Sequence, residues 1–359
     1  MKIIYLTHAD LRKSKGHHRA TYQKLRSLKG LVNKLIIVSS TFKKFKFLEL
    51  VFLELKCILL IFKHNPDAII SRGYVGYLAQ KFAKFKKIKT VREVHADIIE
   101  EIKQYDKSFI SRKLLLPFGY YMQIIDKQSD VRIFNHPKLL FWFRNKFKNI
   151  NNTRDIYAYN GFDYSENCQL DKSKAKNKFK LKTDIQYLVF TGGANYWHGV
   201  NYLAELQKEF NSMDANIQII CGGGKISSKD DPDRCLINFE PLNSKGCMNL
   251  IKASDACILP VRQSRVSPGS ALKLYDYFLH KKFIITQKNL EGYSDEVLRY
   301  GFGTLVNFEE SNLTALKIIK VMKKLKKNNK TKINIKEFSW ETRMSKWINC
   351  LEFLRNKQY

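Results

Sequence analysis

The sequence predicts an α/β protein built from two doubly wound parallel-sheet domains that enclose a cleft. Short apolar segments alternate with helical patterns along almost the whole chain, which indicates right-handed βαβ units. Six such units precede a turn-rich break at residues 160–169, and six more follow it. A chain of 359 residues, of which 44 % are hydrophobic, is long and apolar enough for two cores.

The first half contains six candidate strands, at residues 2–6, 34–38, 67–71, 88–93, 130–134 and around 155–159. The apolar run of the first is too short for a signal peptide. The most apolar stretch, residues 47–62, is interrupted by Glu49, Glu54 and Lys56 and falls short of the ~20 apolar residues that span a bilayer. We expect there a helix that is partly buried against the sheet.

The second half repeats the alternation, with candidate strands at 185–190, 216–221, 235–239, 256–260, 282–286 and 303–307. Helical patterns at 202–210 and 248–255 lie between them, and residues 338–357 form an amphipathic terminal pattern. Parallel strands gather their carboxyl ends at one edge of a sheet, where ligands bind in such folds. A cleft between the domains would then collect both edges.

Composition limits the classes of partner. Lys and Arg number 64 against 33 Asp and Glu, a formal charge of +31, which favours polyanionic partners: nucleic acid, anionic lipid head groups or phosphorylated substrates. The alternative is a Lys- and Asn-rich composition that merely gives a solvated surface. The seven cysteines show no CxxC or metal-ligand spacing, so we expect neither a disulfide framework nor a zinc site, and a soluble, cytoplasmic protein.

The segment SPGSALKLYD, residues 267–276, predicts a helix that begins with a phosphate site. If Ser270 caps the helix, the N–H groups of residues 271–273 point outward together. Lys273 lies in the first turn, where the helix dipole disfavours a cation unless an anion is bound. Asp276, one turn later, could accept hydrogen bonds from sugar hydroxyls. The alternative is a solvent-facing Lys273–Asp276 pair.

Three glycine-containing loops follow predicted strands and precede predicted helices: residues 14–21, 191–199 and 221–225. Glycine lets the backbone approach a phosphate or a base closely, although strand-to-helix turns commonly need glycine for conformation alone. Together, the three loops indicate a phosphate-binding cleft.

The ordered set of motifs resembles the retaining GT-B glycosyltransferases of family four over essentially the whole chain. The motifs are Gly16 after the first strand, Glu93-Val94-His95, Asn160-Gly161-Phe162-Asp163, Gly192-Gly193 with His198-Gly199, Gly222–Gly224, ASDACILP at 253–260, and Ser270-Ala271-Leu272-Lys273 with Asp276. The resemblance implies two Rossmann-like domains. It assigns residues 1–163 and a returning helix at 341–359 to an acceptor-side domain, and residues 164–340 to a nucleotide-sugar domain.

The resemblance also implies roles for individual residues. Lys273 would bind the donor diphosphate, Asp276 would hold the ribose hydroxyls in place of the usual glutamate, and His95 would approach the transferred sugar. The remaining donor-binding positions are Gly16, Gly193, His198, Gly222, Gly223, Arg265, Gly269, Ser270, Ala271 and Leu272.

The chain departs from the family pattern at three positions, two of which remove part of the cationic clamp on the leaving group. Pro268 stands where the first glutamate of the usual pair is expected, His198 replaces the lysine of the glycine loop, and that loop lacks its usual arginine. Arg262 or Arg265 could supply the missing cation.

The implied function is a retaining, metal-independent glycosyltransferase that needs no cofactor and moves a sugar from a nucleotide-diphosphate donor. The acceptor is expected to be lipid-linked or an envelope polysaccharide such as lipopolysaccharide or capsule, at the cytoplasmic face of the membrane. Two alternatives are a GT-B-fold sugar-nucleotide epimerase and a basic nucleic-acid-binding protein, although no recognised nucleic-acid motif supports the latter.

Two further signals have competing interpretations. Asp231 and Asp233 match an Asp-x-Asp metal motif, but in a polar loop we interpret them as turn residues. Segments 42–63 and 139–148 combine aromatic and basic residues, which is typical either of helices packed on a sheet with snorkelling lysines or of peripheral contact with an anionic membrane.

Overall fold

The computed structural model describes residues 1–13, 16–40, 46–104, 109–148, 155–193, 196–240, 242–264, 269–290, 292–327 and 335–356. The chain divides into two compact units. Unit 1 comprises Met1–Gly161, Val266–Ser270 and Ser339–Tyr359, and unit 2 comprises Phe162–Arg265 and Ala271–Phe338.

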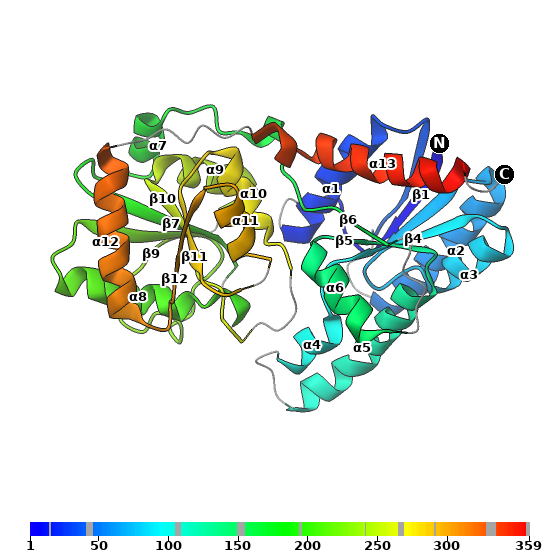
Figure 1. The fold of residues 1–359 in the computed structure, drawn as a ribbon, viewed down its shortest axis with the longest axis horizontal. Coiled ribbons are helices and arrows are strands. Elements are labelled where there is room, and N and C mark those ends of the chain that lie inside the picture. Colours follow the sequence, from blue (N-terminus) through cyan, green and yellow to red (C-terminus); the bar gives the residue numbers. More distant parts are fainter. Residues whose placement is uncertain are drawn as a thin grey trace. The chain divides into compact units, whose positions relative to one another are not determined.

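Unit 1 is built on a parallel sheet of six strands in the order β2-β1-β3-β4-β5-β6 (Figure 1). Nearly every residue of β1, β3, β4 and β5 is buried, which explains why these strands are continuous apolar runs in the sequence. The strands are β1 (Lys2–Thr7), β2 (Lys34–Val38), β3 (Ala68–Arg72), β4 (Lys89–Val94), β5 (Val131–Phe134) and β6 (Ile156–Tyr157).

Helices cover both faces of this sheet. Those of unit 1 are α1 (Gly16–Lys29), α2 (Lys46–His64), α3 (Tyr77–Phe85), α4 (Ile98–Lys103), α5 (Phe109–Gln128), α6 (Pro137–Lys146) and α13 (Trp340–Asn356). Helix α13 packs beside α1 (Figure 1). Trp340 anchors it, because its buried ring donates from Nε1 to Gln23 Oε1 at 3.1 Å.

Unit 2 repeats the architecture with strand order β12-β11-β10-β7-β8-β9, again all parallel. Its strands are β7 (Gln186–Gly192), β8 (Ile217–Gly223), β9 (Ile237–Phe239), β10 (Ala256–Leu259), β11 (Ile284–Gln287) and β12 (Gly303–Val306). Its helices are α7 (Lys172–Lys178), α8 (Val200–Ser212), α9 (Ser244–Ala253), α10 (Leu272–Leu279), α11 (Ser294–Arg299) and α12 (Ser311–Lys327). Short 3₁₀ turns are η1 (Tyr164–Glu166), η2 (Tyr196–His198) and η3 (Ile335–Phe338).

The main chain first enters unit 2 and finally leaves it at neighbouring points. The amide of Phe162 donates to the carbonyl oxygen of Phe338 at 3.0 Å, so the first and last residues of the unit are directly hydrogen bonded.

The predicted fold class is confirmed, because each predicted strand segment overlaps an observed one. The terminal helix begins two residues later than its pattern predicts, since Phe338 ends a separate 3₁₀ turn. All seven cysteines are free. Among the described residues, no helix is both long and apolar enough to cross a membrane.

Candidate functional site

The predicted phosphate-binding helix is α10, and its start differs from the prediction. The N-cap position belongs to Ala271, in extended conformation, and no side chain caps the helix. Ser270 is therefore not the cap. Its carbonyl oxygen instead accepts a hydrogen bond of 3.0 Å from Asn160 Nδ2, which fixes the loop before α10 to the Asn160-Gly161 segment. An alanine cap offers no oxygen to the first amides, so these donors are not used by a capping side chain.

Lys273 lies in the first turn of α10 and reaches the glycine loop after β7. Its Nζ lies 2.7 Å from His198 Nε2 and 4.9 Å from the centroid of the Phe190 ring. His198 Nδ1 lies 2.7 Å from the carbonyl oxygen of Gly193. The tautomer with the proton on Nδ1 satisfies both contacts, because Nδ1 then donates to Gly193 and Nε2 accepts from Lys273.

Gly192 makes this approach possible. Its φ is +119°, and a Cβ at this position would collide with Lys273 Cε. Any other residue would meet both a strained backbone and the lysine stem. The glycine therefore allows the Lys273 side chain to lie directly against the loop.

The second glycine loop of unit 2 lies beside the first. Strands β7 and β8 pair to their ends, with Gly192 opposite Gly223. A Cβ on Gly224 would lie 2.7 Å from Gly193 Cα, so these two backbones are in close contact. Gly223 has φ +101°. The structure thus brings Lys273, His198 and both predicted glycine loops together at the carboxyl edge of one sheet.

The other residues predicted around α10 lie on the helix or just before it. Asp276 follows Lys273 by one turn of α10 and is partly exposed, while its carbonyl oxygen lies 2.8 Å from His280 Nδ1. Leu272 is the first residue of the helix, and Gly269 and Ser270 are buried. Arg265 lies outside the described residues.

Arg262 contacts α8. Its Nη2 donates to Asn201 Oδ1 at 2.6 Å, and its guanidinium lies 5.2 Å from the centroid of the Tyr202 ring.

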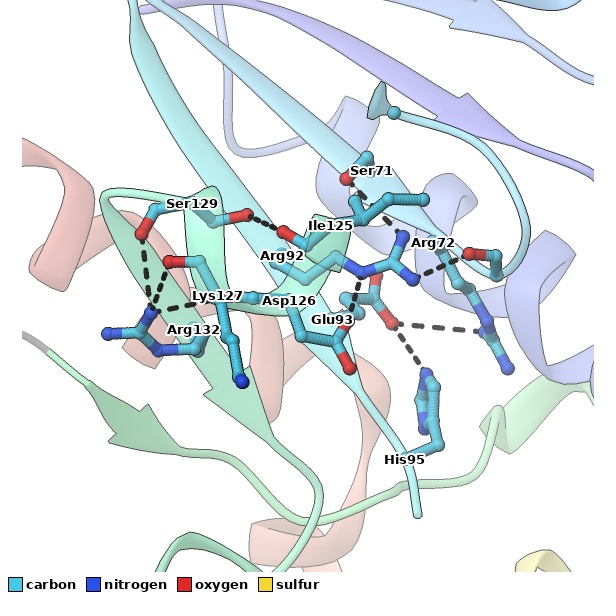
Figure 2. A network of polar contacts seen from close by, with 12 residues as sticks. Ser71, Arg72, Arg92, Glu93, His95, Ile125, Asp126, Lys127, Ser129 and Arg132 are labelled. Atoms are coloured by element: carbon cyan, nitrogen blue, oxygen red, sulfur yellow. Dashed lines mark hydrogen bonds and ion pairs between the residues drawn. The ribbon is translucent and has the colours of Figure 1, made fainter. Parts of the chain in front are cut away.

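In unit 1, His95 lies just beyond the carboxyl end of β4 and contacts a buried carboxylate. Its Nε2 is 3.0 Å from Glu93 Oε2, and Figure 2 shows Arg72 reaching the same carboxylate, with Nη1 at 3.9 Å. Lys24 of α1 donates to Glu93 Oε2 at 2.5 Å, and Tyr5 donates to Oε1. Sequence reasoning missed Lys24, Arg72 and Tyr5.

The electrostatics of this cluster follow from burial and from the Glu93 charge. Burial alone would raise the pKa of Glu93, but Lys24, the His95 hydrogen bond and Arg72 outweigh it and hold that pKa well below its usual range. Burial lowers the pKa of Lys24 to about 8 although Glu93 opposes the shift. Burial and nearby Arg72 lower the pKa of His95 to about 3, so its imidazole is neutral near pH 7.

More imidazoles gather where β1 ends and α1 begins. Gly16, with φ +52°, is the first residue of α1 and has open space where a Cβ would lie. The rings of His17 and His18 are 3.9 Å apart, and the ring of His8 lies 5.7 Å from that of His17. Burial lowers the pKa of His8 to about 4. This group could have been predicted from the sequence, because its histidines lie directly after the first strand or within the first glycine loop.

Two buried arginines lie opposite each other on neighbouring strands, Arg92 on β4 and Arg132 on β5. Arg92 Nε donates to Asp126 Oδ1 at 2.7 Å, and Arg132 Nε lies 2.9 Å from both oxygens of Asp155 (Figure 2 shows the Arg92 contacts). Each guanidinium thus has its own carboxylate, so neither buried charge is left without a counter-ion.

The Asp-x-Asp loop is used as a turn. Asp231 is buried and accepts from the amides of Cys235 at 2.9 Å and Leu236 at 3.0 Å, while Asp233 pairs with Lys208. Within the described part of the chain, no three His, Cys, Asp or Glu side chains come together as a metal site would require.

Neither a scan against protein-family models nor a search of curated protein sequences finds a match. Solved structures do resemble the chain in fold. A sucrose-phosphate synthase from Thermosynechococcus elongatus aligns with TM-score 0.73 and 11 % identity over 100 % of both chains. WaaG, a glycosyltransferase involved in lipopolysaccharide biosynthesis, aligns with TM-score 0.66 and 14 % identity over 97 % of this chain and 95 % of its own. A candidate UDP-N-acetylglucosamine 2-epimerase from Listeria monocytogenes aligns with TM-score 0.61 and 8 % identity, over 100 % and 97 %. These neighbours have the GT-B architecture of two α/β domains.

Proposed function

We propose that this protein is a glycosyltransferase that uses a nucleotide-diphosphate sugar. The observation that carries the proposal is the cluster of Lys273, His198 and the two glycine loops at the start of α10. A lysine in the first turn of a helix without a side-chain cap, with its ammonium against a glycine loop, is suited to bind a diphosphate. Glycosyltransferases are prominent among the structural neighbours, which supports the same activity.

The chemistry assigned to the cluster is stabilisation of the leaving group. Breaking the bond between the anomeric carbon and the diphosphate oxygen places negative charge on the diphosphate. Lys273 and the first amides of α10 would stabilise that charge in a preorganised way, which is why we propose that no divalent metal is required. His198 would hold the Lys273 ammonium at the glycine loop through its unprotonated Nε2.

The remaining roles follow the family resemblance. We assign Asp276 to the ribose hydroxyls, the Gly222–Gly224 loop to the nucleoside and His95 to the transferred sugar. Glu93 would keep His95 oriented through the 3.0 Å hydrogen bond to its Nε2. We further propose retention of anomeric configuration, with the diphosphate oxygen taking the acceptor proton, and a lipid-linked or envelope saccharide as acceptor at the inner face of the membrane.

The test is release of free nucleoside diphosphate from a panel of nucleotide sugars with a bacterial membrane extract as acceptor source. Lys273→Ala should lower turnover by about 10²–10³, the usual cost of removing a charge-stabilising group. Lys320→Ala, an exposed position on α12, is the matched control and should leave turnover unchanged. Equal turnover by wild type and Lys273→Ala would remove Lys273 from the mechanism.

The same assay separates the epimerase alternative, because an epimerase acts without an acceptor. Conversion of a nucleotide sugar to its epimer in buffer alone would contradict the transferase proposal. The Listeria neighbour makes this control necessary.

A further inference from the structure

Helix α2 carries a continuous row of apolar side chains on its exposed face. The row repeats every three or four residues, which places its members on one side of the helix over about 21 Å. Its members and their exposed fractions are Leu48 65 %, Val51 40 %, Phe52 49 %, Leu55 52 %, Leu59 70 % and Phe62 73 %.

This row is separate from the face that packs into the core. Leu53, Cys57 and Ile61, on the other side of α2, are buried against β1 and β3. A helix that is apolar on all sides is normally buried on all sides. Helix α2 is half exposed instead, so its outer row is an apolar surface of the kind that marks an interaction site.

The two acidic residues of α2 are both turned away from this surface. Glu49 accepts from Ser40 Oγ at 2.6 Å and is buried. Glu54 is also buried, and accepts from the amides of Tyr77 and Ala79, each at 2.9 Å, at the start of α3. The exposed side of α2 therefore presents no carboxylate of its own.

Lysines border the row instead. Lys56 and Lys63 are exposed on one flank of α2. Helix α3 packs beside α2 and ends with exposed Phe85 and Lys86, and Lys86 Nζ lies 5.5 Å from the centroid of the Phe62 ring. We name these elements together the α2–α3 surface: the six apolar residues of α2, Phe85, and Lys56, Lys63 and Lys86.

We propose that the α2–α3 surface binds an anionic lipid bilayer, with α2 lying in the plane of the interface. Apolar side chains in one row with lysines at the border and no acid are the pattern of an interfacial helix: the row enters the boundary of the acyl chains while the lysines meet lipid phosphates. The positive charge favours an anionic bilayer over a neutral partner, because the chain carries +31 and the charged residues of the α2–α3 surface are all lysines. The inference is independent of the glycosyltransferase proposal, since it requires neither donor nor acceptor.

The test is sedimentation of the full chain with vesicles, without nucleotide sugar. Wild type should bind phosphatidylcholine vesicles containing phosphatidylglycerol, and bind pure phosphatidylcholine far less. Leu59→Asp with Phe62→Asp should weaken binding to the anionic vesicles by roughly a hundredfold, because each lost apolar side chain costs about tenfold or more. Lys63→Gln with Lys86→Gln should weaken it by about fivefold for each lost lysine charge and leave binding to pure phosphatidylcholine unchanged.

The matched control is Leu313→Asp with Leu316→Asp on α12 of unit 2, where the two leucines are 62 % and 52 % exposed. This variant should bind vesicles as wild type does. Because Leu59 and Phe62 are exposed, their substitution should leave the circular dichroism spectrum unchanged, and it should also leave thermal stabilisation by UDP or GDP unchanged. That readout separates loss of membrane binding from failure of the donor site.

A second measurement places the helix in the lipid. Trp introduced by Phe62→Trp should be quenched by lipids brominated in their acyl chains, whereas Trp introduced by Leu313→Trp should not be. Equal vesicle binding by wild type and the Leu59→Asp, Phe62→Asp variant would overturn the proposal. A second result would also overturn it: the wild type forms a dimer and does not bind vesicles, and the Leu59→Asp, Phe62→Asp variant is a monomer. The α2–α3 surface would then join two copies of the chain.

Discussion

The side chains of Lys273 and His198, 75 positions apart in the sequence, meet with Nζ 2.7 Å from Nε2. The contact places the imidazole at the position where the family resemblance expects a lysine directly beside the ammonium. One cation and one neutral acceptor therefore occupy a place where two cations are expected. The two groups attract each other, because the ammonium donates to the unprotonated Nε2.

We predict that His198→Lys lowers the stability of the ligand-free protein and increases its stabilisation by a nucleoside diphosphate. Two ammonium groups would then face each other with no anion between them, so the ligand-free protein should unfold at a lower temperature than wild type. A bound nucleoside diphosphate would relieve the repulsion, so its stabilising effect should be larger than in wild type. Thermal unfolding with and without UDP and GDP measures both effects. His198→Gln, which stays neutral, is the control, and an equal ligand shift in the Lys and Gln variants would contradict the prediction.

Gly192→Ala should weaken binding of the nucleoside diphosphate more than the backbone strain of a positive φ alone would. The residue has φ +119°, and the added methyl would collide with Lys273 Cε. Gly301→Ala is the matched control, because Gly301 also has positive φ, +64°, but has nothing within 4 Å of the added carbon. Both variants should lose about 1 kcal/mol or more of stability to backbone strain. Only Gly192→Ala should also lose most of its stabilisation by the nucleoside diphosphate, and equal losses in both would show that the lysine contact is unimportant.

The buried pair of Lys24 and Glu93 should behave as a coupled unit. Lys24→Met leaves the Glu93 carboxylate less compensated, and should lower the free energy of unfolding by about 3–5 kcal/mol. Adding Glu93→Gln to Lys24→Met should restore part of that loss. Urea unfolding of the wild type, both single variants and the double variant gives the coupling energy.

The exposed pair of Lys103 and Glu100, with Nζ 3.0 Å from Oε1, provides a reference for this cycle. Breaking it should cost about 1 kcal/mol or less. A Lys24→Met variant as stable as wild type would show that the buried pair has no stabilising role.

Unit 1 should lose stability in mild acid. The pKa values of His8 and His95 are lowered to about 4 and about 3, below the usual 6.5, so between these values the unfolded chain binds protons that the folded chain does not. Stability therefore rises with pH through this window and falls on acidification from about pH 7 to pH 5. The depressed pKa of Glu93 adds its own loss only as the pH falls below its usual value of 4.5.

Urea unfolding at several pH values between 5 and 7 checks this expectation, and His95→Gln should reduce the slope because one imidazole no longer titrates. A slope equal to that of wild type would contradict the assignment of His95 as neutral.

The strands were predictable because buried parallel strands are continuous apolar runs, as in β1 and β10. The location of the glycine loops and of Lys273 was predictable, because residues that follow parallel strands lie at the carboxyl edge of the sheet. The cap of α10 was not, because Ser270 and Ala271 differ by one position and only the backbone conformation decides which precedes the first helical residue. Lys24 and Arg92 were hidden among 64 basic residues, since burial of a charged side chain depends on partners distant in sequence.

The hydrogen bond between Phe162 and Phe338 joins the two outer ends of unit 2, whose two stretches are separated by the Val266–Ser270 segment of unit 1. A segment whose two ends touch can be transplanted between chains without the entropic cost of spanning a gap. Residues 162–338 therefore begin and end at adjoining backbone positions, so exchanging this stretch with the equivalent stretch of another protein of this architecture would leave no gap to close in the remaining chain. These two positions are therefore suitable crossover points for chimaeric chains of this architecture.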